Sequence, residues 1–382
     1  MQYRRMPIEV ESPEEQPGRE LIRFNLSESS VRDCSIRELA GFDTDLVAAL
    51  TDQNLGYGDH RGNPELRSLI AATTSELGPA DVLVTAGAAM ALFIVHTAFL
   101  ERGDEIVVMH PNYATNVETP RAIGAHVMPL HLAYKGGYRL DPDHLESLVC
   151  ERTKLISITD PHNPTGTSLT AAERHHVIRV AERHKCVLLV DETYRDLNRA
   201  AALPWAAEQY SRAISVSSLS KSYGLPGVRV GWAITKNHDY QQRMLAAKEQ
   251  IMICGSVLDE AIAAHALRHR TVLLDRSRTV AEHHLGIVRD WMNAHRYLEW
   301  IEPTGGVVCF PRVHDPFAFD MDLFHLHLRD IGRTLVGPGH WFEVDARSFR
   351  VGFGWPTEEE LIGGLGAIDR SLEAARRGEP HV

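Results

Sequence analysis

The stretch SVSSLSKSYGLPGVRVGW, residues 215–232, decides the fold of this chain. It joins two short apolar runs, AISVS (213–217) and VGWAI (230–234). The loop between them is too short to contain the crossover helix that parallel neighbours require, so the second run is predicted to pair antiparallel. Lys221 lies in this loop among small and hydroxyl residues, and Arg229 follows eight positions later.

Five further apolar runs precede this stretch: VLVT (82–85), EIVVM (105–109), HVMPL (126–130), KLISIT (154–159) and CVLLV (186–190). Short apolar runs bounded by Gly, Pro, Asp or charge are typical of strands buried on both faces. Helical patterns lie between them, such as 89–103 and 170–184, the second with Thr167 and Ser168 as candidate N-caps. The alternation predicts the α/β class: a three-layer αβα large domain around a seven-stranded, mostly parallel sheet.

The C-terminal part of the chain has a different pattern. Helical stretches at 238–268 and 275–295 precede a mixture of short strands and helices that ends with SFRVGFG (348–354) and a helix from Thr357. This mixture predicts a smaller α+β domain. The expected division is an N-terminal arm at 1–44 that contributes to the small domain and covers the active site, a large domain at 45–270 and a small C-terminal domain at 271–382.

Composition and charge exclude several classes of protein. The 382 residues are 44% hydrophobic and 24% charged, which is typical of a folded chain. The formal net charge is −11 and Lys and Arg form no patch, so no nucleic-acid partner is expected. No apolar stretch suits export or membrane insertion, so no membrane partner is expected.

The cysteines and histidines predict neither disulfides nor a metal site. Five cysteines without C-x-x-C spacing indicate free thiols and a cytoplasmic location. His325 and His327, in FHLHL, would point to different faces of a helix, so they are not expected to bind a metal together.

The chemistry of the loop at Lys221 suggests a phosphorylated aldehyde. Lysine forms a Schiff base with an aldehyde, and the surrounding Gly and Ser leave it room. The hydroxyl of Ser218 and the guanidinium of Arg229 suit a phosphate group. On this stretch alone, a solvated surface lysine is an equally good interpretation.

Other polar segments follow predicted strands. DPHNPTGT (160–167) contains Asn163 and follows the fourth run, and Asp191 ends the fifth. TAGAAMAL (85–92) passes directly from a strand into a helix, which gives either a free helix N-terminus for an anion or a simple tight turn. The amides concerned are those of Gly87, Ala88 and Ala89. Ligands of α/β sheets bind at the carboxyl ends of strands, so these segments together predict one site.

This set of residues resembles the fold-type I pyridoxal 5′-phosphate (PLP) enzymes, in particular the class I and II aminotransferases, over nearly the whole chain. In that family the Asn of the N-P-x-G segment and the Asp of the D-x-x-Y segment are typically 28 residues apart, as Asn163 and Asp191 are. The Lys and the phosphate-binding Arg are typically eight apart, as Lys221 and Arg229 are.

The resemblance implies PLP as the cofactor and assigns roles to residues. Lys221 would hold PLP as a Schiff base and, once released, move the proton at the substrate Cα. Asp191 would bind the pyridine nitrogen and keep it protonated. Asn163 and Tyr194 would hydrogen-bond the phenolic oxygen. The other implied cofactor contacts are Tyr113 on the ring and, at the phosphate, Gly87, Ala88, Ala89, Ser218, Arg229 and, from a second subunit, Tyr57.

The resemblance also implies a homodimer with shared active sites and a free amino acid as substrate. Arg350, in SFRVGFG, would grip the α-carboxylate with its guanidinium. Taken alone, a surface ion pair at the start of a strand is the other interpretation. The implied reaction is transamination of an L-amino acid to its 2-oxo acid.

Two other functional classes fit the sequence less well than a PLP-dependent enzyme. Ser218-Leu219-Ser220-Lys221 also fits the S-x-x-K motif of serine acyl hydrolases, but the chain has no S-D-N or K-T-G equivalent. A regulator with a PLP fold would need an N-terminal DNA-binding domain, and the residues before the large domain show no helix-turn-helix pattern.

The segment IRFNLSESSVRDCSIREL (22–39) resembles that of a subgroup acting on guanidino amino acids, namely capreomycidine synthase and the PLP-dependent arginine oxidases and hydroxylases. Glu28, with Asp196 or Glu192, would receive a cationic side chain; a solvated acidic residue is the alternative. Hydroxylating members have a histidine where this chain has Ser30, which argues against hydroxylation. The alternative to transamination is therefore oxidative or cyclising chemistry on arginine, with O2 as a possible co-substrate in place of a 2-oxo acid.

Overall fold

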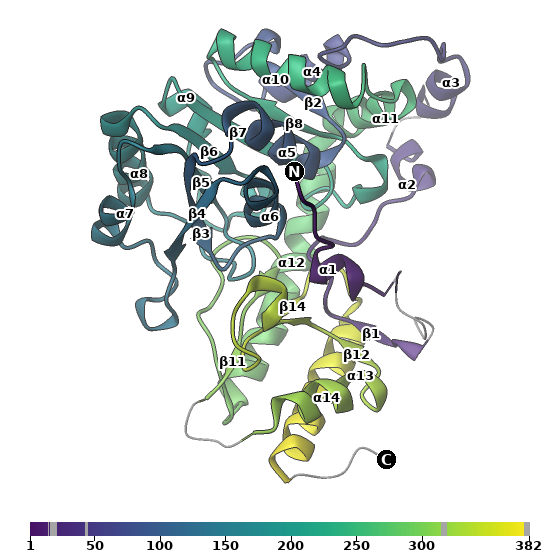
Figure 1. Ribbon diagram of the computed structural model, residues 1–382. Helices are drawn as coiled ribbons and strands as arrows, with labels where there is room; N and C mark the ends of the chain where they lie inside the picture. Colours follow the sequence, from purple (N-terminus) through teal and green to yellow (C-terminus); the bar gives the residue numbers. More distant parts are fainter. Residues whose placement is uncertain (14, 16–20, 43–44, 315–318, 378–382) are drawn as a thin grey trace.

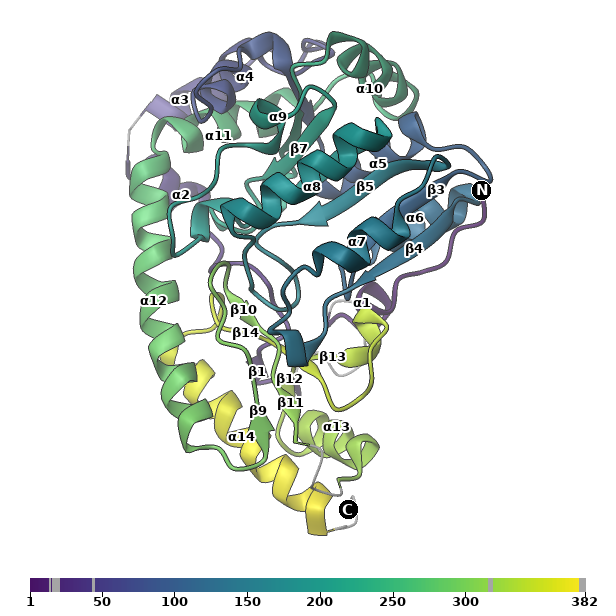
Figure 2. The ribbon, with the colours of Figure 1, turned by 90° about the vertical axis from the view of Figure 1, so that its left-hand side faces the viewer.

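The computed structural model describes residues 1–13, 15, 21–42, 45–314 and 319–377 (Figure 1). A large part, built on one sheet, lies above a smaller one in this view, and helix α12 (Arg270–Ala294) runs from the first into the second. Figure 2 shows the full length of this helix along one side of the molecule.

The large part contains a seven-stranded sheet with the strand order β2-β8-β7-β6-β5-β3-β4. The strands are β2 (Val82–Thr85), β3 (Glu105–His110), β4 (His126–His131), β5 (Thr153–Thr159), β6 (Val187–Asp191), β7 (Ala213–Ser218) and β8 (Gly231–Ile234). The five from β4 to β7 are parallel, whereas β8 is antiparallel to both β7 and β2. The predicted α/β class and the seven-stranded, mostly parallel sheet are confirmed.

Alternate side chains of each strand enter different layers of the core. In β3, Ile106 and Val108 pack with helices of one layer, and Val107 and Met109 pack with helices of the other. The first layer is α5 (Gly87–Phe99), α6 (Thr115–Ile123) and α10 (His238–Ile251); the second is α7 (Pro142–Leu148), α8 (Ala171–His184) and α9 (Ala206–Gln209). Because both faces are covered, consecutive residues are apolar and the strands show no polar alternation.

A further group of helices packs near β2 and β8. Trp232 and Ile234 of β8 lie in one cluster with Leu66 and Ile70. The helices here are α2 (Ile36–Ala40), α3 (Asp45–Thr51), α4 (Pro64–Ala71) and α11 (Val257–Arg268). Single 3-10 turns complete the large part: η2 (Pro79–Asp81), η3 (Tyr134–Gly136), η4 (Arg195–Leu197) and η5 (Pro226–Val228).

Helix α8 begins later than the candidate caps indicated. Its N-cap is Thr170, whose hydroxyl accepts from Glu173 N while the Glu173 carboxylate accepts from Thr170 N. Thr167 and Ser168 are not the caps, because the side chain of Thr167 bonds Thr165 and the amide of Ser168 donates to Thr304. The acidic residue three positions after Thr170 completes a capping box there.

The small part has short strands and helices, and α12, α13 and α14 pack around its own apolar core. Its helices are α12, α13 (Met321–Asp330), α14 (Glu358–Arg377) and the 3-10 helix η6 (Gly339–Phe342). Its strands are β9 (Leu298–Glu299), β10 (Val308–Cys309), β11 (Arg312–Val313), β12 (Thr334–Leu335), β13 (Gly337–Pro338) and β14 (Phe349–Gly352). Leu285, Phe324, Val351 and Leu365 are among its fully buried residues.

The N-terminal segment connects both parts. Helix α1 (Pro7–Val10) lies between the two parts in Figure 1, and β1 (Phe24–Asn25) pairs parallel with β12 of the small part. Leu26 is buried in the core of the small part. The segment near residue 30 therefore reaches the region where the two parts meet.

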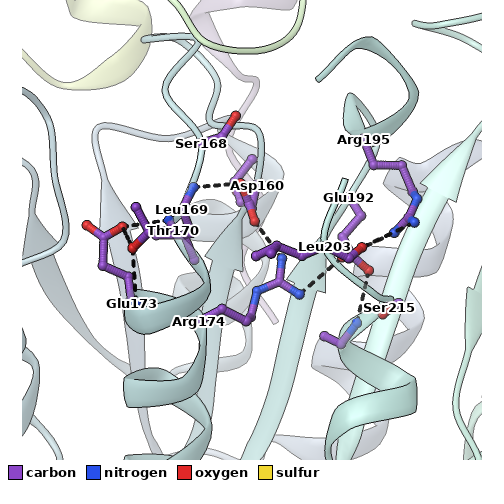
Figure 3. A network of polar contacts seen from close by, with 12 residues as sticks. Asp160, Ser168, Leu169, Thr170, Glu173, Arg174, Glu192, Arg195, Leu203 and Ser215 are labelled. Atoms are coloured by element: carbon purple, nitrogen blue, oxygen red, sulfur yellow. Dashed lines mark hydrogen bonds and ion pairs between the residues drawn. The ribbon is translucent and has the colours of Figure 1, made fainter. Parts of the chain in front are cut away.

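A buried ion network ties two loops of the sheet together (Figure 3). Arg174 of α8 contacts Asp160, which follows β5, at 2.5 Å and Glu192, which follows β6, at 3.2 Å. Arg195 lies 3.6 Å from Glu192 on its other side. The side chains of Arg174, Asp160 and Glu192 are at most 5% exposed, so each charge depends on its partners.

Replacing Arg174 by Met is expected to lower the free energy of unfolding by about 3–5 kcal/mol, because two carboxylates would stay buried without their shared partner. Chemical denaturation measures the change. Arg179→Met, on the exposed side of the same helix, is the matched control and should cost less than about 0.5 kcal/mol. Equal losses in the two variants would contradict the role given to Arg174.

Candidate active site

A cavity of about 270 Å³ lies at the carboxyl ends of β5, β6 and β7. It is closed by the N-terminal segment on one side and by β14 and η6 on another. Eleven of the residues singled out in the sequence line it: Glu28, Ala88, Ala89, Tyr113, Asn163, Asp191, Tyr194, Ser218, Lys221, Arg229 and Arg350. These eleven residues, up to 322 positions apart in the chain, thus share one cavity.

The amine of Lys221 lies inside this site. Its Nζ donates a hydrogen bond of 2.9 Å to Ser29 Oγ. Burial lowers the pKa of Lys221, and the charge of Glu28 opposes that effect while Arg350 adds to it. A lowered pKa increases the fraction of neutral amine, which is the form that attacks an aldehyde or accepts a proton.

Asp191 is a buried carboxylate at the end of β6. Its Oδ1 accepts from both the amide and the hydroxyl of Thr193, at 3.1 and 2.5 Å. Burial nevertheless raises the pKa of Asp191, because these bonds and the charge of Lys221 only partly offset the loss of water. A carboxylate in this position favours a cationic partner.

The N-terminus of α5 and Arg229 form a cradle, in which Gly87 leaves space for the Arg229 guanidinium because it has no side chain. Gly87 has φ +81°, and a Cβ there would lie 2.7 Å from Arg229 Nη2. Arg229 Nη1 donates to Pro226 O and its Nη2 to Ala86 O, which holds the guanidinium beside the first turn of α5. Amides at a helix N-terminus beside a guanidinium bind anions.

Arg350 of β14 is 1% exposed and joins three parts of the site. It donates from Nη1 to Asn163 Oδ1 at 3.0 Å and from Nη2 to Ser27 O at 2.7 Å. Its Nε is buried and has no hydrogen-bond partner among the described residues. The interpretation of Arg350 as a surface ion pair is therefore wrong, and the guanidinium retains a donor for a ligand.

Two tyrosines border the site. Tyr194 donates from its hydroxyl to Ser29 O at 2.5 Å, and burial raises the pKa of Tyr194 to about 12. Burial also raises the pKa of Tyr113, which lines the cavity just before α6. Both rings are therefore neutral hydrogen-bonding and stacking groups at ordinary pH.

Two expected residues do not line the cavity. Gly87 is not among the lining residues, but its lack of a side chain leaves space for the Arg229 guanidinium. Tyr57 lies in the loop between α3 and α4 and is 86% exposed, so it does not reach the site of its own chain.

Two of the three carboxylates considered for a cationic substrate lie elsewhere. Glu192 faces the core and pairs with Arg174 (Figure 3). Asp196 accepts from Tyr223 at 2.9 Å and does not line the cavity. Glu192 N still donates to Val216 O of β7, so the alternation of side chains continues past the end of β6 and Glu192 turns away from the side that Asp191 faces. Of the three, Glu28 alone lines the cavity.

Several residues that line the cavity could not be identified from the sequence pattern. Glu9 and Ile8, from α1, and Trp341, from η6, line the cavity. Glu11 bonds Trp341 Nε1 at 2.7 Å and so ties the first residues of the chain to η6. Thr193, which bonds Asp191, could have been found as an Asx-type turn two positions after the aspartate.

The S-x-x-K interpretation is not supported by these contacts. Ser218 Oγ accepts from Ser220 N at 3.3 Å, and the bond from Lys221 Nζ goes to Ser29 in the part of the chain that the structure describes.

His325 and His327 contact Ala346 O and Ser371 Oγ respectively. No group of three metal-ligating side chains occurs among the described residues.

The donor set fits PLP. The cradle at Gly87 and Arg229 suits the phosphate, buried Asp191 suits the pyridine nitrogen, and Lys221 suits the aldehyde. When bound, PLP supplies an acceptor for the electrons of the bond that breaks at the substrate Cα. The fold and the site define a PLP-dependent enzyme with the aspartate aminotransferase-like fold.

The chain belongs to the aminotransferase class I and II family, whose model matches residues 25–368. Capreomycidine synthase from Streptomyces vinaceus is 32% identical over 93% of this chain and 91% of that protein. A PLP-dependent aminotransferase from Streptococcus suis 89-1591 superposes with a TM-score of 0.91 at 27% identity, covering 98% of this chain and 99% of the other. The PLP-dependent cyclase OrfR superposes with a TM-score of 0.84 at 29% identity, over 92% and 93% of the two chains.

Replacing Gly87 by Ala is expected to weaken PLP binding about tenfold or more, because the added methyl displaces the Arg229 guanidinium. Titration of the cofactor-free protein with PLP measures the dissociation constant. Gly103→Ala is the control, since Gly103 also has a positive φ of +89° but no atom within 4 Å of the new methyl. Unchanged PLP affinity in Gly87→Ala would place the phosphate elsewhere.

Proposed function

We propose that this enzyme transaminates a free L-amino acid with a cationic side chain to the 2-oxo acid. The observation that carries the proposal is the content of one cavity: a buried guanidinium with an unused donor, a buried lysine, and two carboxylates from the N-terminal segment. An α-amino acid needs the first two groups, and a cationic side chain suits the carboxylates.

Four residues have separate roles around the substrate Cα. Arg350 binds the α-carboxylate with Nε and its Nη groups, and Asn163 fixes the guanidinium. Asp191 keeps the pyridine nitrogen protonated when PLP is bound. Burial lowers the pKa of Lys221, which favours the neutral amine, and Nζ would then accept and hold the proton that leaves the substrate Cα.

Glu28 and Glu9 give the proposed side-chain specificity. Both line the cavity, and the charges of both act on Lys221. The N-terminal segment also resembles that of the subgroup acting on guanidino amino acids. A guanidinium binds carboxylates through paired hydrogen bonds, so arginine is the substrate we expect.

Oxidative or cyclising chemistry on arginine is the second candidate. Its support is the similarity to capreomycidine synthase over 93% of this chain and the likeness to a PLP-dependent cyclase. Both reactions begin with the same loss of the Cα proton. They differ from transamination because no 2-oxo acid accepts the amino group.

The proposal includes a homodimer with shared sites, in which Tyr57 reaches the phosphate of the other subunit. Exposed apolar side chains support it: Leu55, Tyr57, Ile251, Ile253 and Leu258. The loop and α11 adjoin, since a Cβ at Gly58 would lie 3.3 Å from Val257 Cγ1. An apolar surface of this kind is typical of an interface.

The proposal also keeps the domain division, with an arm at 1–44, a PLP-binding domain at 45–270 and a small domain at 271–382 that carries Arg350. Pairing of β1 with β12 and the start of α12 at Arg270 support it.

A cytoplasmic location is proposed from the five free thiols. Among the described helices, none is long and apolar enough to cross a membrane.

Incubation of the PLP-loaded enzyme with L-arginine under air, with and without pyruvate as acceptor, tests the reaction. Transamination requires the acceptor and consumes no oxygen, as an oxygen electrode and product analysis would show. Turnover without pyruvate would contradict transamination and support oxidative or cyclising chemistry on arginine. Lys221→Ala is the control: it should lose both turnover and the visible absorbance of lysine-linked PLP, and retention of that absorbance would show that another group holds the cofactor.

Replacing Glu28 by Gln is expected to raise the KM for L-arginine about tenfold and to change the KM for L-alanine little, because one carboxylate partner of the guanidinium is lost. Steady-state kinetics with both amino acids measures the difference. Glu359→Gln, an exposed site in α14, is the control. An unaltered KM for arginine would mean that Glu28 does not contact the side chain.

A further inference from the structure

Ser29 connects two groups of the site through different atoms. Its Oγ accepts from Lys221 Nζ at 2.9 Å, and its carbonyl oxygen accepts from the Tyr194 hydroxyl at 2.5 Å. The residue is 6% exposed. A serine that contacts the reacting amine belongs to the active site by position, although neither its type nor its spacing singled it out.

The segment that carries Ser29 is fixed on both sides. Val31 N donates to the carbonyl of Lys221 at 3.1 Å, and Gly352 N of β14 donates to Leu26 O at 2.7 Å. A Cβ at Gly352 would lie 1.7 Å from Glu28 O, so the close approach requires the glycine. The hydroxyl of Ser29 therefore has a defined position relative to Lys221 and is not carried on a free loop.

We propose that Ser29 is a further catalytic-site residue, whose hydroxyl accepts a hydrogen bond from the Lys221 amine whenever that amine is not linked to the cofactor. This inference rests on the proposed function, in which Lys221 is the cofactor-linked lysine. The bond holds Nζ within the cavity during the part of the cycle when the amine must act on the substrate, and it limits the rotation of a long side chain.

The hydrogen bond has a predictable effect on protonation. A hydroxyl acceptor favours an ammonium over a neutral amine, so loss of Oγ lowers the pKa of Lys221 further. The other charged or titratable groups that act on this amine remain in place when Ser29 changes. They are Glu28 and Glu9 from the N-terminal segment, Asp191, Arg229 and Arg350. The titratable Tyr113 and Tyr194 line the same cavity and also remain.

Competitive labelling of the cofactor-free full chain across a pH series tests the inference directly. The chain has six lysines, so peptide mass spectrometry can follow the labelling of Lys221 alone. In Ser29→Ala the midpoint for Lys221 is expected to move down by about 0.5–1 pH unit. In Ser30→Ala, which removes the same atom from the neighbouring buried residue, it should stay at the wild-type value.

Kinetics of the PLP-loaded enzyme give a second measurement. Ser29→Ala should reduce kcat about fivefold with a nearly constant KM, and the rising limb of the kcat–pH profile should move to lower pH. Unchanged labelling and pH profiles in Ser29→Ala would overturn the inference. Retention of lysine-linked PLP absorbance in Lys221→Ala would instead overturn the proposed function, so the two failures are distinguishable.

Discussion

The position of β8 between β7 and β2 is the constraint on which the site depends. Because β8 runs antiparallel to both neighbours, the short loop from Lys221 to Arg229 ends beside the N-terminus of α5. The contact leaves no room for side chains: a Cβ at Gly231 would lie 2.5 Å from the carbonyl carbon of Gly87. One strand pairing thus brings a lysine, a guanidinium and free helix amides into one cavity.

The charges around that cavity fall into two groups with different roles. Arg174, Arg195, Asp160 and Glu192 balance one another in the core, so they contribute no net charge behind the site. Asp191, Lys221 and Arg350 line the cavity and can bind a ligand. Burial raises the pKa of Asp191 and lowers the pKa of Lys221 and Arg350, and each of these shifts favours the neutral form of the group. The pyridine nitrogen of a cofactor and the carboxylate of a substrate would replace the interactions that water no longer provides.

The N-terminal segment completes the site and connects it to the small part of the molecule. Leu26 is buried in the small core, Ser27 accepts from Arg350, and Ser29 accepts from Lys221 and Tyr194. Any movement of this segment therefore changes the surroundings of both the proposed carboxylate-binding and cofactor-linking residues. Glu28 lies between these contacts in the chain and lines the cavity.

The sequence by itself determined the sheet, the antiparallel β8 and eleven of the residues that line the cavity. Short buried strands are contiguous apolar runs, and spacings such as that of Asn163 and Asp191 are fixed by local structure. The tertiary structure alone decided which acidic residues line the cavity: Glu192 follows Asp191 in sequence but pairs with buried Arg174, whereas distant Glu9 lines the cavity. Ser29 and Lys221 likewise meet across 192 positions. Such pairings follow from strand direction and the packing of distant segments, and neither is encoded in local spacing.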